Sequence, residues 1–86
     1  MSKDVVMYTT GLCGYCSAAK RLLDSKGVEY QNIPVDTDAV KRDEMMEKSG
    51  RRTVPQIFIG DHHVGGFDDL NALESAGKLD ALLSGE

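Results

Sequence analysis

The spacing of hydrophobic positions changes several times along the first half of the chain, and each change predicts a new element. Val5–Thr9 is a short, nearly continuous apolar run rich in β-branched and aromatic residues, which is typical of a strand covered on both faces. Residues 14–26 place apolar side chains three and four positions apart, which predicts a helix that stops at Gly27. Residues 28–35 favour a second strand near a sheet edge, where the missing N–H of Pro34 is tolerated.

The second half of the chain predicts another helix, a hairpin and two short helices. The helix is capped by Asp36 or Asp38 and runs to Ser49, with Val40 and Met45 expected to face inward. The remaining predicted elements are a strand at 56–59, a hairpin turn at 60–61, a strand at 62–64, and helices at 68–76 and 79–84.

This order of elements predicts an α/β fold. The right-handed crossover rule pairs the first two strands in parallel, and the hairpin then adds its two strands antiparallel. The result is a four-stranded mixed sheet with helices on both faces. With 86 residues, 41% of them hydrophobic and 28% charged, the chain has ordinary globular composition, and we expect residues 1–86 to form one domain.

Charge and hydropathy exclude several classes of function. The formal net charge is −4, which argues against a nucleic-acid partner held through its phosphates. The N-terminal segment has no apolar core of signal-peptide length, and no apolar run approaches a membrane span. We therefore expect a cytoplasmic protein with no membrane partner. We also expect a monomer.

The two cysteines, Cys13 and Cys16, are the strongest chemical signal. A disulfide between them would close a loop of only four residues and tie nothing distant together, so the pair is chemical rather than structural. A C-x-x-C pair between a strand and a helix is typical of a redox site. A helix N-terminus favours the thiolate of Cys13, whereas Cys16 lies one turn deeper and is expected to act as the resolving thiol. Tyr15 places an aromatic ring beside the reactive sulfur.

A zinc site is the competing interpretation of the cysteine pair. Two further ligands would be needed, and the only histidines are His62 and His63. Consecutive residues of a strand point to opposite faces, so these two side chains cannot easily share an ion. Redox chemistry is favoured over metal binding.

Three motifs in order extend this interpretation: Tyr8-Thr9 followed by Cys13-Gly14-Tyr15-Cys16, then Thr53-Val54-Pro55, and then Gly65-Gly66-Phe67-Asp68-Asp69. Together they resemble the glutaredoxin family, and specifically its short bacterial dithiol members, over essentially the whole chain. The resemblance implies a thioredoxin fold with sheet order 2-1-3-4. It also implies reduction by glutathione of disulfide-containing or glutathionylated proteins, with ribonucleotide reductase as one family substrate.

The resemblance further implies a glutathione site, in which Tyr15 and Thr53 also take part. It implies a cis peptide bond at Val54-Pro55 that exposes the Val54 backbone for pairing with glutathione, although a proline that merely begins a strand would give the same pattern. It implies that Arg52 meets the glycine carboxylate, although Arg52 could equally be a solvated turn residue.

The Gly-Gly segment before the third helix completes the implied site. Close backbone approach at Gly66 and the N–H groups of Phe67 and Asp68 would receive the γ-glutamyl carboxylate, and the Asp68 side chain would meet the ammonium group. Asp68 could also serve as the helix N-cap.

Two departures from the family pattern leave alternatives open. Thr10 stands where many members have lysine, and Gly14 stands where many dithiol members have proline. A glycine at that position occurs in glutaredoxins that hold a [2Fe-2S] cluster between two subunits through thiolates like Cys13. The hypotheses are therefore a glutathione-dependent oxidoreductase, a cluster-binding dimer, and a redoxin that does not use glutathione.

Overall fold

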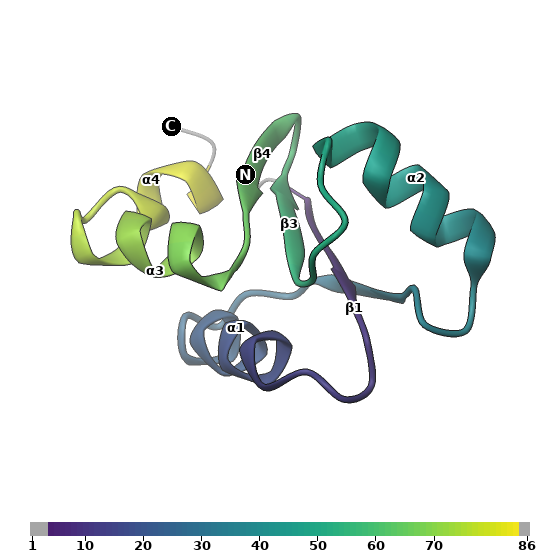
Figure 1. Ribbon diagram of the computed structural model, residues 1–86. Coiled ribbons are helices and arrows are strands. Elements are labelled where there is room, and N and C mark those ends of the chain that lie inside the picture. Colours follow the sequence, from purple (N-terminus) through teal and green to yellow (C-terminus); the bar gives the residue numbers. More distant parts are fainter. Residues whose placement is uncertain (1–3, 85–86) are drawn as a thin grey trace.

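The computed structural model describes residues 4–84 and contains a four-stranded sheet (Figure 1). The elements are β1 (Val5–Thr9), α1 (Gly14–Ser25), β2 (Gln31–Pro34), α2 (Ala39–Ser49), β3 (Gln56–Ile59), β4 (His62–Gly65), α3 (Phe67–Ser75) and α4 (Leu79–Ser84). The strand order is β2-β1-β3-β4, with β1 parallel to β2 and antiparallel to β3, and with β3 antiparallel to β4. The mixed sheet and its order are confirmed.

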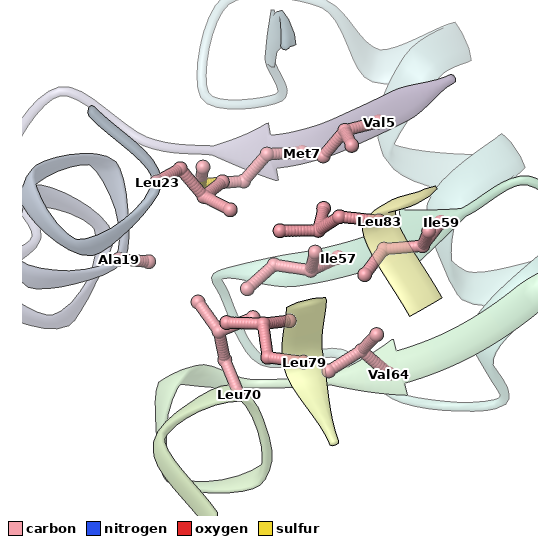
Figure 2. Packing of buried hydrophobic residues seen from close by; sticks show 10 residues of the cluster. All are labelled: Val5, Met7, Ala19, Leu23, Ile57, Ile59, Val64, Leu70, Leu79 and Leu83. Carbon is pink, nitrogen blue, oxygen red and sulfur yellow. The ribbon is translucent and has the colours of Figure 1, made fainter. Parts of the chain in front are cut away.

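Helices cover the two faces of the sheet unequally. Alternation along β1 sends Val5 and Met7 to the face covered by α1, α3 and α4, and sends Tyr8 to the face covered by α2 (Figure 1). Figure 2 shows the larger cluster of buried side chains, which consists of Val5, Met7, Ala19, Leu23, Ile57, Ile59, Val64, Leu70, Leu79 and Leu83. The smaller cluster on the α2 face consists of Tyr8, Ile33, Val35 and Met45.

The ends of the helices follow the predicted signals. Gly27 and Gly50 adopt left-handed conformations with φ of 69° and 70°, where a side chain would be strained, and they follow α1 and α2 as expected. Of the two candidate caps for α2, Asp38 takes the role, because its carboxylate accepts a hydrogen bond from the Lys41 N–H at 3.1 Å.

Two expectations about the middle of the chain are wrong. The second strand begins at Gln31 rather than at residue 28, because β1 is only five residues long and its register pairs Val6 with Gln31. The Val28 N–H is instead bonded to the Leu23 carbonyl at 3.1 Å in the turn that ends α1. Val40 was expected to face inward, but its side chain is 77% exposed.

The start of α3 also differs from the prediction. The helix begins at Phe67 with Gly66 as its N-cap, so Asp68 lies inside the first turn and does not cap the helix.

The helices are all short: between residues 4 and 84, none is long and apolar enough to cross a membrane. The cytoplasmic location and the monomeric state stay predictions.

Candidate active site

Cys13 occupies the N-cap position of α1 and presents its sulfur to the start of the helix. Its backbone is extended, with φ of −143° and ψ of 109°, and its Sγ accepts a hydrogen bond from the Cys16 N–H at 3.1 Å. In most helices an oxygen of Ser, Thr, Asp or Asn takes this place. Here a sulfur takes this place, at the positive end of the helix dipole.

Cys16 lies one turn further along α1 and faces the interior. Its side chain is 1% exposed, and both cysteines are free thiols. Burial raises the pKa of the Cys16 thiol to about 11, and the adjacent Cys13 adds to the rise. The two thiols are therefore unequal, with one sulfur at the helix start and the other protonated and shielded.

The segment before β3 lies opposite Cys13. The Val54-Pro55 peptide bond is cis, as the family resemblance implied. The Val54 carbonyl oxygen lies 3.9 Å from the Cys13 sulfur. A chain joined to Cys13 would therefore begin beside the Val54 backbone.

The turn between β4 and α3 forms a second wall of the site. Gly65 has φ of 112°, and a side chain there would collide with the Asp69 carboxylate. That carboxylate accepts a hydrogen bond from the Gly66 N–H at 3.1 Å and pairs with the Arg51 guanidinium at 3.2 Å. Both contacts lower the pKa of Asp69, the backbone bond more than Arg51. The N–H groups of Phe67 and Asp68, in the first turn of α3, have no acceptor within the helix.

These segments enclose a hollow of about 310 Å³. Gly66 faces Pro55 across the hollow, and a Cβ added to Gly66 would lie 3.5 Å from the Pro55 carbonyl oxygen, in ordinary van der Waals contact. The Tyr15 ring, 64% exposed, stacks on Phe67 with centroids 6.3 Å apart and joins α1 to α3. The hollow is lined by Tyr15, Arg51, Thr53, Val54, Pro55, Gly66, Phe67, Asp68 and Asp69.

Most residues of the predicted glutathione site thus lie together, with one exception. Arg52 is exposed and lies outside the lining of the hollow, whereas its neighbour Arg51 lines it. Sequence reasoning missed Arg51 and Asp69. The second aspartate of the Gly-Gly-Phe-Asp-Asp motif was the available signal, because an acidic residue three positions after an N-cap commonly accepts a bond from the cap N–H.

Sequence reasoning also missed a polar pair behind the site. Gln56, at the start of β3, is 0% exposed and is bonded to Thr53 and to His63. His63 stacks on Phe58 with centroids 4.8 Å apart, whereas His62 is exposed. Between residues 4 and 84, no group of three or more His, Cys, Asp or Glu side chains is placed to hold a metal ion.

A thiol at the N-cap of a helix and a buried thiol one turn further along, on this sheet, are typical of the class of thioredoxin-fold thiol-disulfide oxidoreductases. Residues 5–64 match the family model described as Glutaredoxin. The chain belongs to the glutaredoxin family, and it is an enzyme of thiol-disulfide exchange.

Similar proteins from bacteria and a plant are also glutaredoxins. The chain is 56% identical over 80 residues to glutaredoxin 3 of Escherichia coli K12, covering 93% of this chain and 96% of that one. It is 60% identical over 80 residues to a glutaredoxin of Pseudomonas aeruginosa, covering 93% and 95%. Among solved structures, a buckwheat glutaredoxin-glutathione complex superposes with a TM-score of 0.88 at 35% identity, covering 96% of this chain and 78% of that one.

Proposed function

We propose that the protein reduces protein disulfides and glutathione mixed disulfides with glutathione as its reductant. The observation that carries this proposal is the hollow beside Cys13, which combines an open peptide backbone at Val54 with free N–H donors at the start of α3. A tripeptide with a carboxylate at one end matches both features. The buckwheat glutaredoxin-glutathione complex, whose protein shares the fold of this chain, supports glutathione as the ligand.

Different residues of the hollow bind different groups of glutathione. The N–H groups of Phe67 and Asp68 receive the γ-glutamyl carboxylate, and the Asp68 carboxylate receives the ammonium group. Thr53, Val54 and Pro55 offer their backbone to the cysteine residue of glutathione. Arg51 lines the hollow and Arg52 does not, which favours Arg51 over the predicted Arg52 as the basic group of its wall. Gly66 has no side chain and lets glutathione approach the backbone, and the Tyr15 ring supplies an apolar side.

The chemistry follows from the unequal thiols. With a glutathionylated protein, the Cys13 thiolate attacks the glutathione sulfur and expels the protein thiolate, which takes up a proton. A second glutathione thiolate then attacks the glutathione sulfur held on Cys13, which forms oxidised glutathione and frees Cys13. With a protein disulfide, Cys13 forms a mixed disulfide with the protein. Cys16, once deprotonated, attacks the Cys13 sulfur, forms the Cys13–Cys16 disulfide and releases the protein as a dithiol. Two glutathiones then reduce the Cys13–Cys16 disulfide by two successive exchanges and leave as oxidised glutathione.

Two thiol variants test the division of roles. Cys13→Ser is expected to abolish both reactions, and Cys16→Ser is expected to abolish reduction of protein disulfides while it keeps reduction of glutathionylated peptides. The measurement is NADPH consumption in coupled assays with each substrate. Equal loss of both activities in both variants would contradict the assignment.

The reductant is tested by comparing two coupled systems. Glutathione with glutathione reductase is expected to sustain turnover, and a thioredoxin reductase alone is not. A variant of Asp68 tests the binding site. Asp68→Asn is expected to raise the KM for a glutathionylated peptide about two- to tenfold, because it removes the charge-assisted contact between the Asp68 carboxylate and the ammonium group of glutathione. Asp61→Asn, in the exposed hairpin, is the matched control. Turnover with the thioredoxin reductase alone would favour a redoxin that does not use glutathione.

The [2Fe-2S] alternative has a separate outcome. One chain offers a single thiolate at the helix start, so a cluster would need a second copy of the chain and two glutathiones. Gly14 leaves the surface beside Cys13 open, because an added Cβ would meet nothing within 4 Å. Anaerobic purification is expected to give a colourless monomer. A coloured dimer that loses its colour in Cys13→Ser would establish the cluster instead.

A further inference from the structure

A partly buried series of hydrogen bonds, centred on the buried Gln56, links β4 to the wall of the active site. The His63 Nε2 lies 2.7 Å from the Gln56 Oε1, and the Gln56 Nε2 donates to the Thr53 carbonyl oxygen at 3.0 Å and to its hydroxyl oxygen at 3.1 Å. Thr53 and Val54 line the hollow, and the Val54 carbonyl lies 3.9 Å from the Cys13 sulfur. This series of hydrogen bonds therefore ends at the Thr53-Val54 backbone, beside the Cys13 thiol.

The direction of each bond in this series is fixed by chemistry. The Thr53 carbonyl can only accept, so the side of the Gln56 amide that faces it must be the NH₂ group. The other side is then an oxygen, which also can only accept. His63 must therefore carry a proton on Nε2 and donate it to Gln56.

The surroundings hold His63 in this role. Its ring stacks on Phe58 with an interplanar angle of 27°, which fixes the plane of the imidazole. Burial, with the nearby Arg51 next in effect, lowers the pKa of His63 and favours the neutral ring. A neutral ring has one proton, and the Gln56 oxygen draws it to Nε2.

We propose that His63 is a positioning residue for the reaction: through Gln56 it orients the Thr53-Val54 backbone against the substrate chain joined to Cys13. His63 itself lies outside the lining of the hollow, so it acts without touching the substrate. Gln56 is 0% exposed, and without His63 its oxygen would have no water to bond. The amide would then turn or shift, and the Thr53 carbonyl would lose its fixed direction. The inference rests on the proposed function for the identity of the substrate.

Three variants test the proposal. His63→Phe keeps the stacking on Phe58 and removes the donor. His63→Gln keeps a side-chain N–H that can reach Gln56, and His62→Phe is the matched control on the exposed neighbour. We expect His63→Phe to raise the KM for a glutathionylated peptide about fivefold, which corresponds to ~1 kcal/mol, with little change in kcat. His63→Gln should restore most of the wild-type KM, and His62→Phe should leave it unchanged.

Each other result overturns the proposal. A purely structural role would lower the melting temperature of His63→Phe while leaving KM at the wild-type value. If wild-type protein does not turn over the glutathionylated peptide with glutathione as reductant, the proposed function fails. The same three variants are then compared on a plain protein disulfide, where an unchanged KM in His63→Phe overturns the inference. Nitrogen-15 NMR of the wild-type imidazole gives an independent check: a bare Nε2 on His63 contradicts the proposed direction of the bond.

Discussion

Gly14 offers a substitution whose effect on stability can be worked out from the backbone. It is the first residue of α1, where a helix has no acceptor for the N–H group and where proline is favoured. The residue before a proline must be extended, and Cys13 already has φ of −143° and ψ of 109°. A Cβ at Gly14 would meet nothing within 4 Å. Gly14→Pro is therefore compatible with the folded structure.

The magnitude comes from the unfolded chain. Proline restricts the unfolded backbone far more than glycine does, so Gly14→Pro is expected to raise the free energy of unfolding by about 0.4–1 kcal/mol. For a chain of this size that corresponds to a rise in melting temperature of roughly 2–8 °C. The assay is thermal unfolding followed by circular dichroism, with reductase activity measured in parallel and expected to be retained.

A second glycine supplies the control. Gly50→Ala places a side chain at φ of 70°, and it is expected to lower the free energy of unfolding by about 1 kcal/mol. A lower melting temperature for Gly14→Pro, or loss of activity in a folded variant, would refute the reasoning from helix position and Cys13 geometry.

Two further predictions concern the fold. The pKa of Asp69 is lowered by the Gly66 N–H and by Arg51, so its contribution to stability is present above the ordinary value of 3.8 and is lost as pH falls through its lowered pKa. Urea unfolding should show Asp69→Asn less stable than wild type at pH 7 and closer to it at pH 3, and a pH-independent difference would contradict this. Leu70→Ala should lower the free energy of unfolding by about 2–5 kcal/mol, and Val40→Ala by less than about 0.5, measured in the same way. Similar losses would contradict the assigned burial.

The sequence predicted the sheet and the thiol pair because both depend on local patterns. Apolar runs and glycine stops define the elements, and the crossover rule then leaves few ways to join them. Val40 shows the limit of this reasoning. A hydrophobic residue near the start of α2 fits the helical pattern, but its exposure depends on how that helix lies on the sheet, which spacing alone does not determine.

The walls of the site were harder to predict than the cysteines. Arg51 and Arg52 are adjacent and identical in type, and the sequence does not show that Arg51 is the one that pairs with Asp69 and lines the hollow. Gln56 begins an otherwise apolar strand, and its partner His63 lies across the hairpin. To predict the contact between Gln56 and His63, the register of β3 and β4 must be known. That register includes an irregularity between Ile57 and Phe58 for which the sequence contains no signal.

The burial of Cys16 has a consequence for measuring how the molecule opens. In an unfolded chain Cys13 and Cys16 are equivalent thiols, so their inequality is a property of the tertiary structure. In Cys13→Ser protein, an alkylating reagent can reach Cys16 only when α1 separates from the core. An opening free energy of about 5 kcal/mol would slow alkylation by roughly 10³- to 10⁴-fold relative to the unfolded chain. The resolving thiol is thus a built-in probe of the stability of the helix that carries the active site.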